Sequence, residues 1–247
     1  MTCSNGGDGI QIFRNNQSGF ELEYTFPGSS FCYNSVMVGE GDLVVYNIGT
    51  DLFIQKRNNN TYDLFQSITL SAVVMSIHQS KNGEEIVLAS PLGVGNYFRR
   101  NASGLYELIQ TFNEPSTAVE SIFIHESNEL VALGSFDKNV YIYRKVGSLY
   151  SINQTLFVGF DVFHVELIKE TLIVTGLTNS IVFYKDNGSQ YIFDHTIPTS
   201  EVRIMKMQVS EDLKKLAYGG TNQTFNLFEV VNGSYQSSFS YNIGSTI

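Results

Sequence analysis

The segments GNYFRRNASGLYELIQTF (95–112) and VYIYRKVGSLYSINQTL (140–156) share one pattern. Each has a short run of β-branched and aromatic residues, a polar turn, and an aromatic residue that opens a second run, which is typical of a β-hairpin. Four more copies lie at 10–26, 52–68, 181–197 and 225–241. The aromatic after the turn is Phe20, Tyr62, Tyr106, Tyr150, Tyr191 or Tyr235, at intervals of 41 to 44 residues. The chain therefore contains six copies of one repeat.

Each repeat has room for four strands, because two further apolar runs separate successive hairpins. VESIFIHE (119–126) and ELVALGSF (129–136) are one such pair. EIVLAS (85–90) is continuously apolar, as in a strand covered on both faces, whereas YDLFQSI (62–68) alternates like an outer strand with one face in water. Each repeat is thus predicted to form one four-stranded antiparallel sheet.

Such sheets cannot bury both faces alone, so neighbouring repeats must stack. Radial stacking leaves only short, protected edges and gives a β-propeller. A linear β-solenoid is the alternative, but its rungs are usually much shorter than this repeat. We expect an all-β, six-unit propeller in one domain, 1–247. Its units are expected at about 1–28, 29–70, 71–114, 115–157, 158–199 and 200–247.

The fourth repeat, VESIFIHESNELVALGSFDKNVYIYRK (119–145), resembles a WD40 repeat. It has a strand ending in Gly134-Ser135, then Asp137 in a turn, then a strand that ends in Tyr143-Arg144 where WD40 repeats carry Trp-Asp. The Gly-His dipeptide of that family is missing. The resemblance implies a WD40-like propeller whose blades are held mainly by packing.

The two ends of the sequence do not complete a closed ring of six full units. Met1 aligns with Val131, in the second strand of a unit, so the N-terminal blade is predicted to lack its innermost strand. Only residues 243–247 follow the last outer strand. We expect either one three-stranded blade or a part of a longer propeller.

Composition argues against several partners. The net charge is −9, with 15 basic and 24 acidic residues, which disfavours nucleic acid and anionic membranes. No apolar run could span a bilayer, and the first nine residues do not resemble a signal peptide. Cys3 and Cys32 are too few for a disulfide framework or a zinc site. A cytoplasmic protein is the expectation.

No pattern indicates catalysis, a metal or a cofactor. His78 and His125 are predicted just after equivalent inner strands, as turn residues, while His164 falls in an inner strand and His195 in an outer one. The inner strands also carry scattered polar residues of mixed charge. These are Glu120, Glu166, Arg203, Lys206 and Gln208. We therefore expect a protein that is not an enzyme.

Eight of the fifteen basic residues directly follow the terminal aromatic of the third strand and would form a crescent on the rim. They are Arg14, Lys56, Arg57, Arg99, Arg100, Arg144, Lys145 and Lys185. Of these, Arg99, Arg100, Arg144 and Lys145 are candidate contacts for an acidic partner. The favoured alternative is cross-strand pairing, which would set Arg14 near Glu21, Lys56 near Asp63 and Arg99 near Glu107.

Phe136, Phe157 and Phe160 are candidate partner-binding residues, because they fall in or beside neighbouring loops on a face where WD40-like propellers often bind peptides. The favoured alternative is that they wedge between the fourth and fifth blades.

Seven Asn-x-Ser/Thr sequences occur, mostly in the turn between the third and fourth strands. They begin at Asn16, Asn59, Asn101, Asn153, Asn187, Asn222 and Asn232. Turns favour these residues for their backbone angles, so turn formation is the preferred explanation over glycosylation.

The sequence thus predicts a non-catalytic protein-interaction scaffold inside a larger assembly. The alternatives are an extracellular or lumenal glycosylated ligand-binding propeller of integrin-like type and, less favoured, a propeller hydrolase.

Overall fold

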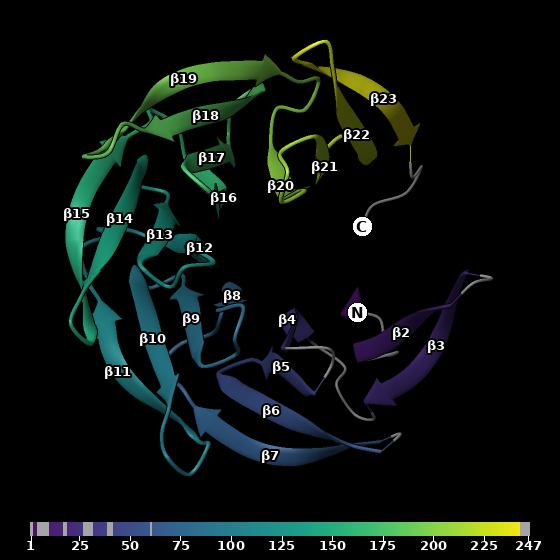
Figure 1. Cartoon of the computed structure of the whole chain (residues 1–247), viewed down its shortest axis with the longest axis vertical. Coiled ribbons are helices and arrows are strands. Elements are labelled where there is room, and N and C mark those ends of the chain that lie inside the picture. Colours follow the sequence, from purple (N-terminus) through teal and green to yellow (C-terminus); the bar gives the residue numbers. More distant parts are fainter. Residues whose placement is uncertain are drawn as a thin grey trace.

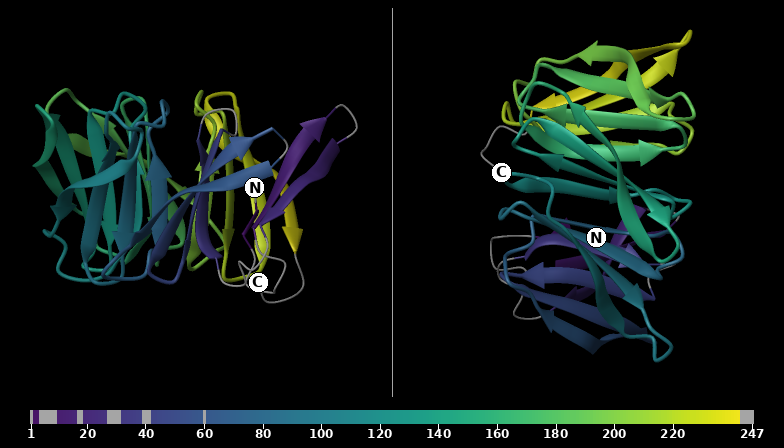
Figure 2. Two further views of the ribbon diagram at one scale, coloured as in Figure 1. Left: turned by 90° about the horizontal axis from the view of Figure 1, so that it is seen from below. Right: turned by 90° about the vertical axis from the view of Figure 1, so that its left-hand side faces the viewer.

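The computed structural model describes residues 2–3, 10–16, 19–26, 32–38, 42–59 and 61–242. The secondary structure in these ranges consists of β-strands, and the sheets that they form are arranged around a common axis (Figure 1). The first sheet has three strands, β1 (Thr2–Cys3), β2 (Ile10–Asn16) and β3 (Gly19–Phe26). The connecting loops gather at the two ends of the sheets (Figure 2).

Five further sheets have four antiparallel strands each, which follow in chain order from the strand nearest the axis to the strand at the rim. The second sheet has β4 (Cys32–Val38), β5 (Leu43–Ile48), β6 (Asp51–Asn58) and β7 (Thr61–Thr69). The third has β8 (Ser76–Gln79), β9 (Glu85–Ser90), β10 (Val94–Arg100) and β11 (Tyr106–Phe112). The fourth has β12 (Val119–Ile124), β13 (Leu130–Ser135), β14 (Asn139–Val146) and β15 (Leu149–Phe157). The fifth has β16 (Val162–Ile168), β17 (Thr171–Gly176), β18 (Ser180–Asp186) and β19 (Tyr191–Pro198). The last has β20 (Ile204–Val209), β21 (Lys215–Gly220), β22 (Thr224–Val231) and β23 (Ser234–Asn242).

The all-β class and the propeller arrangement of four-stranded antiparallel blades are therefore confirmed. Within the described ranges the complete blades number five, and the N-terminal sheet has three strands. Its first strand, β1, pairs with β2 as the second strand of the other blades pairs with the third. Below, a blade is named by its strands, and its outward face is the one turned toward the next blade along the chain.

The blades are held by apolar side chains that alternate between two interfaces. Every residue of β13 is buried, because Val131 and Leu133 pack toward the preceding blade while Leu130 and Ala132 pack toward the following one. This double burial explains why the second strand of a repeat has a continuous apolar sequence rather than alternation. The prediction from EIVLAS (85–90) is confirmed in the same way, since all of β9 is buried.

In the blades β8–β11 and β12–β15, the recurring tyrosine at the start of the outer strand bonds to a turn of its own blade. The hydroxyl of Tyr106 donates to the carbonyl of Gly83, and the hydroxyl of Tyr150 donates to the carbonyl of Asn128, at 2.5 and 2.7 Å. Both acceptors lie in the tight turn between the first and second strands and have positive φ, 69° and 60°. The outer strand is thus fastened to a turn close to the axis, and the expectation that these aromatics pack the blade is confirmed.

A glutamine in the outer strand fastens each of three blades to the next one. The amide of Gln110 accepts from the backbone N–H of Tyr150 at 2.8 Å and donates to the carbonyl of the same residue at 2.6 Å. Gln66 pairs in this way with Tyr106, and Gln154 with Tyr191. We call this contact the glutamine clasp. It satisfies polar backbone groups on the edge of the outer strand, where no further strand pairs.

Candidate functional site

The inner strands of five blades surround a central channel. A cavity of about 580 Å³ lies in it, lined by residues of β4, β8, β12, β16 and β20 and, in the last blade, also by residues of β21 and β22 such as Phe225. This volume is in the usual range of ligand pockets, so the polar groups that face it decide what the channel can do.

Two serines of the channel are used to hold neighbouring inner strands. Ser76 Oγ lies 3.5 Å from the backbone N–H of Ile122, and Ser121 Oγ accepts from the backbone N–H of Val165 at 3.1 Å. The inner edge of each first strand has no further strand to pair with, so a polar side chain of the preceding blade takes that place.

His78 has the same structural use, and its predicted position is wrong. It lies within β8, not in a turn after it, and its Nδ1 accepts from the backbone N–H of Ile124 at 3.3 Å while its ring stacks on Phe123. Burial lowers the pKa of His78 to about 3, and the nearby His164 acts in the same direction. His78 is therefore neutral at physiological pH. His125 does follow β12, as predicted.

Glu166 and His164 face each other in the channel. Glu166 Oε1 accepts from Gln208 Nε2 at 3.0 Å and from the backbone N–H of Val209 at 3.3 Å. Its Oε2 lies 3.8 Å from His164 Nε2 and has no hydrogen-bond partner, nor has either nitrogen of His164. Within the described ranges, no group of three or more His, Cys, Asp and Glu side chains is placed to hold a metal ion.

A cluster of apolar and cationic side chains surrounds one mouth of the channel. The rings of Phe136 and Phe163 meet edge to face with centroids 4.8 Å apart, and the guanidinium of Arg203 lies over Phe163 at 3.9 Å. Arg203 also forms a β-bridge with Leu177, and Met205 lines a cavity of about 170 Å³ beside Phe163. We call these five residues the mouth cluster. They come from the blades β12–β15, β16–β19 and β20–β23 and the loops that adjoin them.

Part of the mouth cluster is exposed to solvent, while Phe163 beneath it is held in the packed structure. Leu177 is 50% and Met205 40% exposed, whereas Phe163 is buried. Beside the cluster, burial raises the pKa of Glu120 while Arg203 and Lys206 oppose that rise, and desolvation in the channel lowers the pKa of Lys206. Three of the polar residues that the sequence showed only as scattered, Glu120, Arg203 and Lys206, are thus brought together at this mouth.

The three predicted phenylalanines differ in their surroundings. Phe136 packs on Phe163, and Phe160 packs against the apolar core between β12–β15 and β16–β19. Phe157, at the end of β15, is 70% exposed. Packing thus accounts for Phe136 and Phe160, while partner binding by any of the three stays a prediction.

The predicted cross-strand register of the basic crescent is confirmed. Arg99 pairs across from Glu107, Lys56 from Asp63, and Arg14 from Glu21. Other members of the crescent make contacts that the sequence did not show. The guanidinium of Arg100 lies 3.3 Å from the carboxylate of Glu84. Binding of an acidic partner by the crescent stays a prediction.

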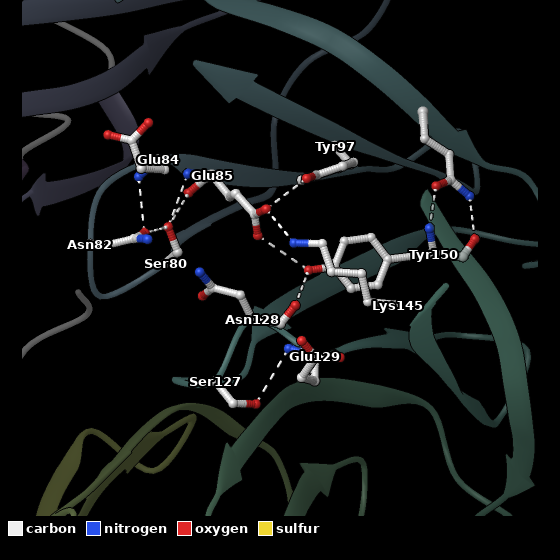
Figure 3. A network of polar contacts seen from close by, with 11 residues as sticks. Ser80, Asn82, Glu84, Glu85, Tyr97, Ser127, Asn128, Glu129, Lys145 and Tyr150 are labelled. Atoms are coloured by element: carbon white, nitrogen blue, oxygen red, sulfur yellow. Dashed lines mark hydrogen bonds and ion pairs between the residues drawn. The ribbon is translucent and has the colours of Figure 1, made fainter. Parts of the chain in front are cut away.

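Lys145 belongs to a buried network between two blades (Figure 3). Its Nζ lies 2.5 Å from Glu85 Oε1, which also accepts from the hydroxyl of Tyr97 at 2.8 Å, and Tyr150 Oη lies 3.3 Å from Glu85 Oε2. Burial, assisted by the Glu85 carboxylate, raises the pKa of both tyrosine hydroxyls, which therefore remain protonated donors. This network adds a buried ion pair to the packing that was expected to be the main interaction between the blades.

Four of the Asn-x-Ser/Thr sequences are placed as turn formation requires, whereas Asn153 lies within the outer strand β15. Asn59 and Asn232 have positive φ, 56° and 52°. The side chain of Asn101 accepts from the backbone N–H of Ser103 at 2.9 Å, and that of Asn187 from Ser189 at 3.1 Å. The turn role of these four asparagines is confirmed, and glycosylation stays an untested alternative.

The comparisons with known proteins show the fold. No family model and no curated protein matches the chain. Among solved structures, the chain is similar to a functionally unknown protein from Desulfotomaculum acetoxidans DSM 771, with a TM-score of 0.76 and 15% identity over 91% of this chain and 74% of that one. The class defined by the fold is the β-propeller. The described ranges contain no helix that is long and apolar enough to cross a membrane.

Proposed function

We propose that this propeller is a non-catalytic, WD40-like interaction scaffold that binds a protein partner at the mouth cluster. The observation that carries the proposal is the exposure of Leu177 and Met205 directly beside Arg203, whose guanidinium is held over Phe163. Exposed apolar side chains around an immobilised arginine are the composition of protein-interaction hot spots.

The surrounding blades support a binding role rather than a chemical one. Ser76, His78, Ser121 and Glu166 all accept hydrogen bonds from the backbone of the next blade, so these channel groups maintain the scaffold. Because the loops of the mouth are fixed on packed sheets, a partner would lose little free energy to ordering them on binding.

The test is affinity purification of the tagged full chain from cells of the organism that expresses it, with quantification of co-purifying proteins. The double variant Leu177→Asp and Met205→Asp should lose a partner that the unaltered chain retains in fixed proportion, because charge at the mouth prevents apolar contact. The control is Leu108→Asp, which alters a similarly exposed residue on the outer rim.

Thermal unfolding must first show that the variants are as stable as the unaltered chain. Retention of every partner by the mouth variant, or equal loss by the rim control, would contradict a binding site at the mouth cluster.

A further inference from the structure

The outward face of the last blade is uncovered at positions where other blades are buried. Leu52, Val140 and Ile181 occupy one register position on the outward faces of their blades, and each is 0% exposed. Phe225 holds that position in the last blade, since it pairs with Gly219 as Val140 pairs with Gly134, and it is 42% exposed. Figure 1 shows the sheets β20–β23 and β1–β3 at the two ends of the arc.

The outer strand of the same face carries a stacked aromatic pair. Phe239 and Tyr241 have nearly parallel rings, 4° apart in orientation with centroids 6.4 Å apart, and are 50% and 59% exposed. They lie opposite Leu227 and Phe225 in β22. Two large aromatic side chains in water beside an exposed Phe225 form the kind of patch that marks an interaction surface.

One other sheet has an aromatic pair at these register positions. In the first sheet, Tyr24 and Phe26 lie opposite Ile12 and Ile10, as Phe239 and Tyr241 lie opposite Leu227 and Phe225. The blades between them carry polar residues at the position of Tyr24 and Phe239. These are Gln66, Gln110, Gln154 and His195.

In the first sheet, the next blade covers this pair with tyrosines. Tyr24 meets Tyr62 with ring centroids 5.4 Å apart, and Phe26 meets both Tyr46 and Tyr62 at 5.5 Å. In the first sheet, an aromatic pair at these positions is thus covered by two tyrosines of the following blade, Tyr46 and Tyr62.

We propose that the outward face of the last blade binds a seventh blade, a four-stranded antiparallel sheet that lies outside residues 1–247. Its inward face has aromatic side chains at the positions that Tyr46 and Tyr62 hold in β4–β7. The interface continues the packing that joins the preceding blades.

The first experiment uses the second repeat of this chain as a probe, fused as a copy of residues 29–70 to the end of the full chain. Hydrogen exchange of the backbone amides in β22 and β23 is then measured. We expect exchange there to slow about tenfold or more, because the added sheet covers this face. The matched control carries Tyr46→Ser and Tyr62→Ser in the added copy only and should remove the protection. Unchanged exchange in β22 and β23, with the added copy itself protected, would overturn the proposal.

A second measurement decides the matter even if the added copy does not fold. A photo-crosslinking amino acid replaces Tyr241 in the full chain, which is expressed in its own organism and irradiated. The expected product joins position 241 to a segment of alternating apolar residues that lies outside residues 1–247. Products within residues 10–26 of the same chain, products between two copies of this chain, or no product would each overturn the proposal. The same amino acid at Leu108, on the rim, controls for random collision.

Discussion

Basic residues that look equivalent in the sequence have different uses in the structure. Lys145 reaches across a blade interface to the buried carboxylate of Glu85, while Lys185, in the same crescent, is exposed on β18. A charge reversal that includes Lys145 would therefore test stability as well as partner binding. A charge reversal at the exposed members of the crescent would test partner binding alone.

Replacing Lys145 by methionine should destabilise the protein by about 3–5 kcal/mol, because the Glu85 carboxylate would remain buried without its cation. Urea unfolding measures this loss. The double variant Lys145→Met with Glu85→Gln should recover part of it, since the uncompensated charge is then removed. Equal losses in the single and double variants would show that the ion pair is not the cause.

Acid should destabilise the fold partly through His78. Its pKa is lowered to about 3 in the folded state and is near 6.5 when unfolded, so the unfolded state binds the extra proton between these values. The contribution of neutral His78 is therefore complete above about pH 6.5 and falls as the pH drops toward 3. His78→Gln should reduce this slope when unfolding free energies are compared at pH 7 and pH 5. His195→Gln, at an exposed site on β19, is the control and should change the slope less.

At the scale of the strand, the glutamines of the clasp are visible in the sequence, but the sequence does not show what they bind. Gln66, Gln110 and Gln154 each stand four residues after the recurring tyrosine. A polar residue in an alternating outer strand is usually solvated, and nothing local shows that the backbone of the next repeat lies within reach. Only the stacking of the blades supplies the partner.

Gln110→Met should cost about 1–3 kcal/mol, because the apolar side chain fills a similar volume but leaves the backbone groups of Tyr150 without their partner across the interface. Chemical unfolding monitors the loss. Gln190→Met, in an exposed turn, should change stability by less than about 0.5 kcal/mol. A loss at Gln190 as large as that at Gln110 would mean that the clasp contributes nothing specific.

For the whole molecule, the spacing of the repeats was sufficient to predict the fold. The intervals between the recurring aromatics set the size of a blade, and the continuous apolar runs identified the doubly buried strands, so the register of Arg99 with Glu107 could also be predicted. His78 was misplaced because its strand, β8, has only four residues and no alternation that marks its end.

The mouth cluster could be predicted only in part. Phe136 was recognised from its loop, but Leu177 and Arg203 lie in other repeats, and their proximity depends on how adjacent blades are rotated about the axis. That rotation follows from side-chain packing across the interfaces, which a single sequence does not reveal.

The glutamine clasp joins each of three blades only to its immediate successor, so this contact does not depend on the number of blades in the ring. A duplicated repeat inserted between two clasped blades would meet the same tyrosine on one side and offer the same glutamine on the other. Growth by gene duplication is thus compatible with the local chemistry at every junction of this type.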